Sequence, residues 1–190
     1  FEYVNAPPGS GKKLSDYAKF KTDYLSFIRE FGAILEKYKV EYVTVNNEPD
    51  LFFQEQTQWG SETQIFNYVA EFMPLANKAV KETFKGKTIN KVTQVQKRPQ
   101  NVIDASFADV DIASVDVGPP AGIGIESYKK EFVDEYDFYA KEAQKRGMPW
   151  IVGEYWAHNF NEEPSDYVKQ NQLALAKASF DAYLATTPKG

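Results

Sequence analysis

The chain has 190 residues, of which 43% are hydrophobic and 26% are charged, and its formal net charge is −5 at pH 7. This is the composition of a globular protein with one sizeable core. The acidic balance, without a long basic block, argues against a nucleic-acid partner, and no apolar run approaches the roughly 18–20 residues of a membrane span. Cysteine is absent and histidine occurs once, which excludes disulfides, thiolate metal ligands and sites built from several imidazoles.

Short β-rich runs alternate with long amphipathic helices along the chain. Strands are predicted at residues 1–4, 40–45, 88–95, 110–117 and 150–152, and helices at residues 14–38, 63–85, 126–146 and 165–184. We expect Ser15 to cap the first helix and Pro74 to kink or split the second. Gly86 and Gly147 are expected to end the second and third helices.

Strands that alternate with helices predict parallel βαβ units and an α/β fold, either a doubly wound open sheet or a (β/α) barrel of the TIM type. A complete eight-fold barrel takes about 250 residues, with a floor of about 200. With about five strands, residues 1–190 are expected to form a single, incomplete barrel domain. The first residues, Phe1–Val4, include neither an initiator Met nor the layout of a signal peptide. That beginning is typical of a mature product or of a segment of a longer chain.

Two predicted strands end in carboxylates. One runs into Asn47-Glu48-Pro49 and the other into Glu154. Because the carboxyl ends of parallel strands share one face of the fold, both carboxylates are expected to project toward one cleft. The alternative is that both are turn or helix N-terminal acids that backbone N–H groups satisfy.

A pair of glutamates across a cleft suits hydrolysis of a glycosidic bond, because one carboxyl must give a proton to the leaving oxygen while the other stays ionised. Asn47 is a neutral donor suited to the sugar 2-hydroxyl. Tyr155 and Trp156, beside Glu154, offer a hydroxyl and an apolar wall for a sugar ring, although Trp156 is equally suited to the core.

These residues and their spacing resemble clan A of the retaining glycoside hydrolases, the 4/7 superfamily, which includes cellulases, β-mannanases, β-xylosidases and β-galactosidases. The two glutamates are 106 residues apart, which fits three βα units. The resemblance implies that the chain covers roughly strands 3–7 of the barrel, with Glu48 as acid/base, Glu154 as nucleophile and Asn47 on the 2-hydroxyl. It also implies a β-linked carbohydrate substrate, no metal or organic cofactor, and an extracellular or cell-surface location. The run from Asn47 to Phe53 resembles the β-xylosidase members.

The chain departs from that clan in several places. Asp116 ends the strand where many members carry a Tyr, and it is expected either to contact substrate or to cap the turn. His158 follows the second glutamate, either as a sugar contact or as a surface-loop residue. Strands one, two and eight have no counterpart, and a half-barrel would leave open sheet edges. We therefore expect remaining barrel segments or a second copy to complete it.

Two other functions compete with hydrolysis. One is a non-catalytic carbohydrate-binding or structural domain on the same barrel. The other is nucleotide binding by residues 7–12, PPGSGK, but a phosphate-binding loop requires Gly at the position of Ala6 and Ser or Thr at that of Lys13. The resemblance to the glycoside hydrolase clan instead implies that this loop is the turn after strand three, with Asn5 as a candidate sugar contact and Lys12 and Lys13 as solvated charges.

Overall fold

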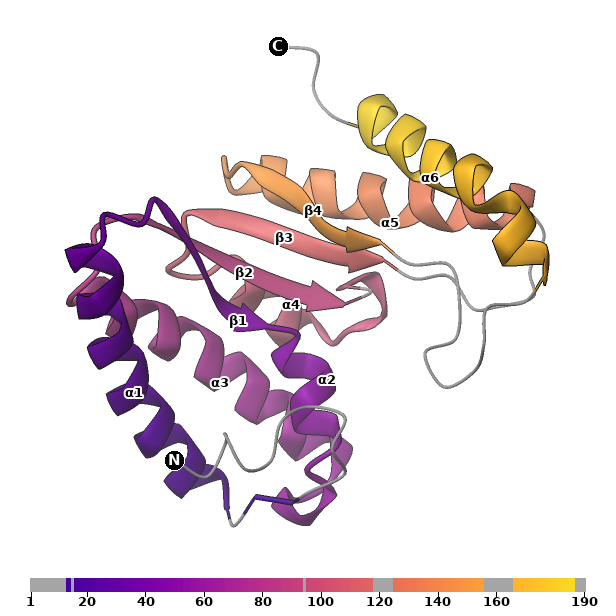
Figure 1. Ribbon diagram of the computed structural model, residues 1–190. Coiled ribbons are helices and arrows are strands. Elements are labelled where there is room, and N and C mark those ends of the chain that lie inside the picture. The colour runs from indigo at the N-terminus through magenta and orange to yellow at the C-terminus, as the bar shows by residue number, and fades with distance from the viewer. Residues whose placement is uncertain (1–12, 15, 94, 118–124, 156–165, 187–190) are drawn as a thin grey trace. The chain divides into compact units, whose positions relative to one another are not determined.

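A computed structural model describes residues 13–14, 16–93, 95–117, 125–155 and 166–186 (Figure 1). Its contacts divide the chain into two compact units. The first unit comprises residues 1–93 and 98–113, and the second comprises residues 94–97 and 114–190. Among the described residues the strands form one sheet in the order β1-β2-β3-β4. The predicted α/β fold with parallel strands is confirmed.

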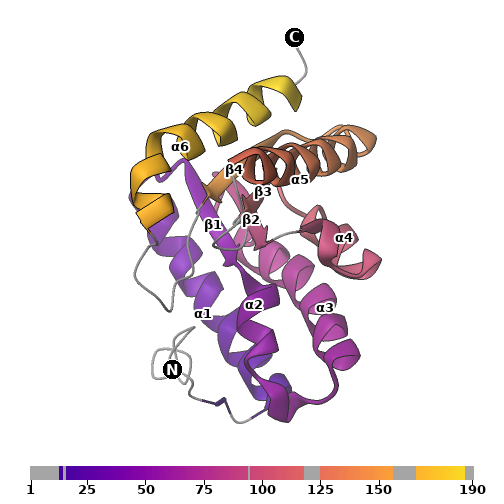
Figure 2. The ribbon, with the colours of Figure 1, turned by 90° about the vertical axis from the view of Figure 1, so that its right-hand side faces the viewer.

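In the first unit, helices pack against the parallel pair β1 and β2. Its elements are α1 (Tyr17–Lys37), β1 (Tyr42–Asn47), α2 (Pro49–Gln54), α3 (Glu62–Lys81), β2 (Lys87–Thr93) and α4 (Gln100–Ser106), with a 3-10 turn at Thr57–Trp59. Helices α1 and α3 lie side by side in both views (Figures 1 and 2). The β1–β2 register runs from Tyr42 opposite Lys87 to Asn47 opposite Lys91.

The core of the first unit is largely aromatic. Phe20 of α1 contacts the rings of Phe53, Trp59 and Phe72, with centroids 5.4–5.6 Å away. Tyr17 stacks on Tyr68 at 3.9 Å. Aromatic pairs at these separations stabilise a core beyond the area that they bury, so much of the aromatic content of this unit serves packing.

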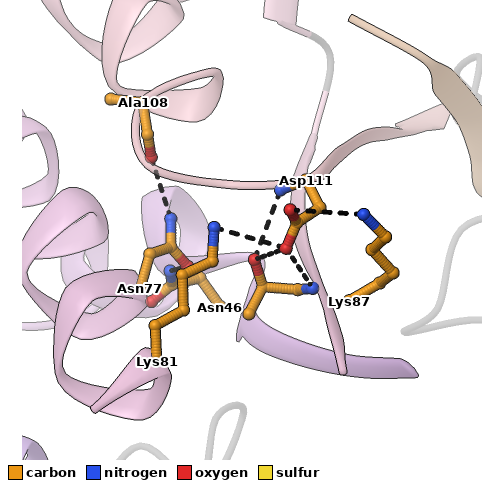
Figure 3. Close-up of polar contacts among 7 residues, drawn as sticks. Asn46, Asn77, Lys81, Lys87, Ala108 and Asp111 are labelled. Carbon is orange, nitrogen blue, oxygen red and sulfur yellow. Dashed lines mark hydrogen bonds and ion pairs between the residues drawn. The ribbon is translucent and has the colours of Figure 1, made fainter. Parts of the chain in front are cut away.

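An irregularity in β1 changes its burial pattern just before the predicted acid. The register shifts between Thr44 and Asn46, and the successive residues Val45 and Asn46 are both buried. Asn46 Nδ2 donates to Asn90 Oδ1 at 2.7 Å and to Asn77 Oδ1 at 3.3 Å. Figure 3 shows Asn46 and Asn77 at this network, which ties β1 to α3.

The second unit contains a 3-10 turn at Val95–Lys97, most of β3 (Ile112–Val117), α5 (Ile125–Lys145), β4 (Trp150–Tyr155) and α6 (Asp166–Thr186). Helices α5 and α6 pack together, and the Tyr136 hydroxyl lies 2.8 Å from Ser179 Oγ between them. Trp150 of β4 packs against Tyr139 and Tyr183. No helix among the described residues is long and apolar enough to cross a membrane.

Several local expectations are corrected. Asp16 caps α1, because its carboxylate accepts from the Lys19 N–H at 2.7 Å, and Ser15 lies outside the described residues. Pro74 does not split α3, whose residues on both sides are buried in the core, and the alternative of a kink at Pro74 stays a prediction. That helix ends at Lys81, before Gly86. A Cβ at Gly86 would lie 2.7 Å from the Glu41 carbonyl oxygen, so this glycine allows a close approach of two backbone segments.

Other expectations of this kind are confirmed or extended. Gly147 follows α5 with φ +62°, the left-handed conformation typical of a helix C-terminus. The short helices α2 and α4 were not predicted. The strand predicted at residues 1–4 lies outside the described residues.

Candidate functional site

Glu48 lies where β1 ends and α2 begins. Its N–H donates to the Lys91 carbonyl at 2.8 Å, which continues the pairing with β2, and its carbonyl accepts from Leu51 and Phe52, each at 3.1 Å. To join strand and helix within one residue, Glu48 takes the left-handed conformation, φ 49° and ψ 49°. A residue with a Cβ pays roughly 1–2 kcal/mol for this conformation, and the following Pro49 favours an extended conformation instead. The surrounding contacts therefore hold Glu48 in a strained backbone.

The Glu48 carboxylate is bound from the neighbouring strand. Thr93 Oγ1, at the end of β2, donates to Glu48 Oε1 at 3.0 Å. Glu48 is the N-cap residue of α2, but its side chain makes no capping hydrogen bond. The alternative of a helix N-terminal acid satisfied by backbone N–H groups is thus not observed for Glu48. Asn47 is exposed and borders a cavity of about 30 Å³ beside Pro49.

A buried ion pair lies next to Glu48. Asp50, two residues on, has a fully buried side chain, and its Oδ2 is 2.7 Å from Arg98, whose side chain is 11% exposed. Arg98 Nε also donates to the Thr93 carbonyl at 3.1 Å. Burial raises the pKa of Asp50 to about 6, an effect that Arg98 opposes and the nearby Glu48 reinforces. Sequence reasoning missed Asp50 and Arg98, although an Asp just after a helix-starting Pro and an Arg just after the next strand were visible signals.

A second polar cluster lies at the amino end of β2. Asp111 Oδ2 accepts from Thr88 N and Thr88 Oγ1, both at 2.9 Å, and lies 3.3 Å from Lys81 Nζ. Figure 3 shows Lys81 and Lys87 on either side of this carboxylate. Burial raises the pKa of Asp111, but the Thr88 hydrogen bonds and Lys81 outweigh it, so that this pKa lies below its ordinary value. This cluster ties the strands to α3.

The other predicted site residues with a description lie in the second unit. Glu154 is exposed within β4. The exposed Tyr155 meets Phe132 edge-on, with ring centroids 6.2 Å apart. Asp116 is fully buried in β3. The nearby charge of Asp116 contributes, after burial, to raising the pKa of Tyr136 to about 12.

Several residues that the sequence predicted for the site have no described position. Asn5, Trp156, His158 and the loop at residues 7–12 lie outside the described residues. Glu48 belongs to the first unit and Glu154 to the second, so their pairing across a cleft stays a prediction. Lys13 is exposed, but its Nζ donates to the Glu55 carbonyl rather than only to solvent. The described residues hold no cluster of three or more His, Asp or Glu side chains that could bind a metal ion.

Comparison with known proteins identifies the fold. No protein-family model and no curated protein sequence matches the chain. Among solved structures, it is similar to the GH113 β-mannanase AaManA from Alicyclobacillus acidocaldarius in complex with ManMIm, with a TM-score of 0.52 and 10% identity. A GH113 β-1,4-mannanase also matches, with a TM-score of 0.35, 13% identity and coverage of 75% of this chain and 52% of that one.

The AaManA match covers 92% of this chain but 49% of the mannanase, so the chain spans about half the length of that enzyme. At 10% identity this likeness is one of fold. The prediction of a partial (β/α) barrel is confirmed, and the barrel is of the kind found in a glycoside hydrolase.

Proposed function

We propose that this chain is part of the catalytic barrel of a retaining β-glycoside hydrolase that cleaves a β-linked oligo- or polysaccharide. The observation that carries the proposal is the Glu48 carboxylate, held at the carboxyl end of β1 in a strained backbone and bound by Thr93 of the adjacent strand. Strained residues gather at functional sites because the surrounding structure must over-determine them. The fold likeness to a β-mannanase supports the same reading.

The proposed mechanism is a double displacement. Glu154 attacks the anomeric carbon while Glu48 gives its proton to the leaving oxygen, which forms a glycosyl-enzyme. Glu48 then takes a proton from water, the water oxygen attacks the anomeric carbon, and Glu154 leaves with the configuration retained. The two carboxyls must lie about 5–5.5 Å apart for this chemistry.

Further residues are proposed to hold the sugar. Asn47 donates to the 2-hydroxyl, where such bonds strengthen at the transition state. Tyr155 and Trp156 border the ring, and the remaining candidate contacts are Asn5, Asp116 and His158. Because the similar AaManA is a β-mannanase, β-linked mannan is the first polymer to assay, followed by glucan, xylan and galactan.

The proposed activity requires the rest of the barrel. Strand β4 is the last in the order of the described sheet, and beside it lies a groove of about 680 Å³ lined by Ile151, Tyr155, Leu173, Phe180 and Tyr183. Leu173 and Phe180 are 84% and 63% exposed. Large apolar side chains exposed together in this way mark an interaction surface. We propose that a further strand–helix unit covers this groove, supplied by the same polypeptide or by a second copy.

Mechanism-based labelling tests the proposal. The longest natural polypeptide that contains the chain would be treated with activated 2-deoxy-2-fluoro glycosides of mannose, glucose, xylose and galactose, and its peptides analysed by mass spectrometry. We expect the label on Glu154. Glu154→Gln should abolish labelling, whereas Glu41→Gln, an exposed acid that precedes β1, should label as the wild type does.

The labelling result also separates the competing function. A folded protein that takes no label from any of the four sugars would overturn the hydrolase proposal. Sugar binding that persists in the same protein, and in Glu48→Gln and Glu154→Gln, would favour the non-catalytic carbohydrate-binding domain.

A further inference from the structure

Glu48, Thr93, Arg98 and Asp50 form a ring of contacts. Thr93 Oγ1 donates to Glu48 Oε1 at 3.0 Å, Arg98 Nε donates to the Thr93 carbonyl at 3.1 Å, and the Arg98 guanidinium lies 2.7 Å from Asp50 Oδ2. The backbone through Pro49 joins Asp50 to Glu48 and completes the ring. All of these contacts lie within the first unit.

We propose that Arg98, anchored by Asp50, and Thr93 are positioning residues that orient the Glu48 carboxyl for proton transfer; this inference rests on the proposed function. Thr93 fixes Oε1 as a hydrogen-bond acceptor, which leaves Oε2 as the oxygen that carries the proton to the leaving group. Arg98 acts through Thr93, because it holds the carbonyl of the same residue whose hydroxyl binds Glu48.

Burial makes this ring rigid and costly to disturb. Thr93 is buried, Asp50 is fully buried, and the Arg98 guanidinium also lies over the Phe66 ring, 6.0 Å from its centroid. A buried ion pair contributes little net stability, because the free energy of desolvation offsets most of the attraction between the two charges. A ring of this kind is better explained by geometry, because the strained backbone at Glu48 persists only where the surrounding structure over-determines it.

The same strand offers a matched control. Thr88 is also a buried β2 threonine whose hydroxyl donates to a carboxylate, that of Asp111 at 2.9 Å. Thr88 lies at the amino end of the strand and Thr93 at the carboxyl end. Thr88→Val therefore removes an equivalent hydrogen bond without touching the ring. For Arg98, the control is Arg29, which pairs with Glu82 at the surface.

The experiment compares substrates that differ in their need for an acid, with the longest natural polypeptide that contains the chain. Thr93→Val should lower kcat for alkyl β-glycosides by about three- to tenfold, the worth of one hydrogen bond, with KM little changed. Turnover of glycosyl fluorides, whose leaving group needs little protonation, should fall less. The quantity compared is the ratio of kcat for alkyl β-glycosides to kcat for glycosyl fluorides. Thr93→Ser should restore the wild-type ratio, and Arg98→Met should lower it as Thr93→Val does. The control variants Thr88→Val and Arg29→Met should leave it unchanged.

A second readout does not require turnover. In protein with 13C-labelled glutamate carboxyls, the Glu48 resonance is the one that disappears in Glu48→Gln. It should shift in Thr93→Val and Arg98→Met, return in Thr93→Ser, and stay in place in Thr88→Val. If the proposed hydrolase function fails, no variant will turn over any glycoside, yet this resonance still tests the ring. A Glu48 resonance unmoved by Thr93→Val, with both substrate types slowed equally, would overturn the positioning role.

Discussion

The two ends of β2 hold a buried or partly buried aspartate in opposite ways. At the amino end, Asp111 receives two hydrogen bonds from Thr88 and faces Lys81, and its pKa is held below the ordinary value although burial opposes this. At the carboxyl end, Asp50 faces Arg98 in full burial, and its pKa is raised to about 6. The number of donors and the depth of burial, rather than the presence of a cation, separate the two.

This difference suggests that the amino end of β2 contributes to stability and the carboxyl end to function. The Asp111 cluster favours the charged folded state and therefore stabilises the fold near neutral pH. Burial makes the charged form of Asp50 unfavourable in the folded state. Carboxyl groups whose pKa is raised in this way are common at functional sites. The strained backbone of Glu48 lies at this same carboxyl end, next to Thr93.

The largest expected contrast is in activity. Glu48→Gln should lower kcat for glycosides with poor leaving groups by about 10²–10⁴, because it removes the acid that protonates the leaving oxygen. Asp111→Asn should leave kcat unchanged. Steady-state kinetics on both variants, with circular dichroism to verify folding, measure this contrast, and equal losses in the two variants would remove the functional distinction between the ends.

Removal of the arginine tests the cost of the buried pair. Arg98→Met should lower the free energy of unfolding by about 3–5 kcal/mol, because it leaves the Asp50 carboxyl buried without a counter-charge. Arg29→Met breaks an exposed pair and should cost at most about 1 kcal/mol. Urea denaturation measures both. The double variant Asp50→Asn/Arg98→Met should be more stable than Arg98→Met alone, and no such recovery would argue against the pair as the source of the cost.

The amino end should respond more mildly. Asp111→Ala should lower the free energy of unfolding by about 1–3 kcal/mol, since the buried Thr88 loses the acceptor of its N–H and hydroxyl. Asp104→Ala, at an exposed position of α4, should have a much smaller effect in the same urea experiment. A similar stability for the two variants would show that Asp111 does not hold this end of the strand.

The two ends should also depend on pH with opposite signs. Asp50 has a folded-state pKa above its unfolded value, so the folded state binds the extra proton, and stability from this group falls as pH rises from about 4 to 6, by about 1.4 kcal/mol for each unit by which the pKa is raised. Asp111 has a lowered pKa, so its contribution is present above its unfolded value of about 3.9 and is lost as pH falls.

Unfolding free energies of the wild type, Asp50→Asn and Asp111→Ala between pH 3 and 7 measure these slopes. Relative to Asp50→Asn, the wild type should lose stability as pH rises. Relative to Asp111→Ala, it should gain stability over the lower part of the range. Parallel curves for all three proteins would contradict the opposite perturbation of the two aspartates.

The sequence was sufficient for the long elements of the fold. Apolar positions at helical spacing located α1 and α3, and α5 and α6 were also predicted within a few residues of their bounds. Helix α2 has six residues and begins at Pro49, so it is too short to show a period. The close approach at Gly86 depends on where the segment before β1 passes, which no local pattern encodes, and the glycine was therefore mistaken for a helix end.

For the candidate site, the sequence pointed to Glu48 but not to the residues that contact it. Asn-Glu-Pro after an apolar strand predicted Glu48 as a site residue, because such polar residues are rare at the end of a buried strand, and its catalytic role stays a prediction. The contact with Thr93 depends on the register between β1 and β2, and that register contains an irregularity. Arg98 reaches Asp50 only because the chain turns back after β2. Contacts of this kind follow from tertiary structure rather than from spacing.

The left-handed backbone at position 48 has an evolutionary consequence. Glycine adopts φ 49° and ψ 49° without a Cβ penalty, and asparagine tolerates it better than glutamate. A lineage that no longer needed the acid would drift toward those residues, because they relieve the backbone strain at this position. A survey of natural variants at this single position would therefore distinguish lineages under selection for the carboxyl from those that keep only the scaffold.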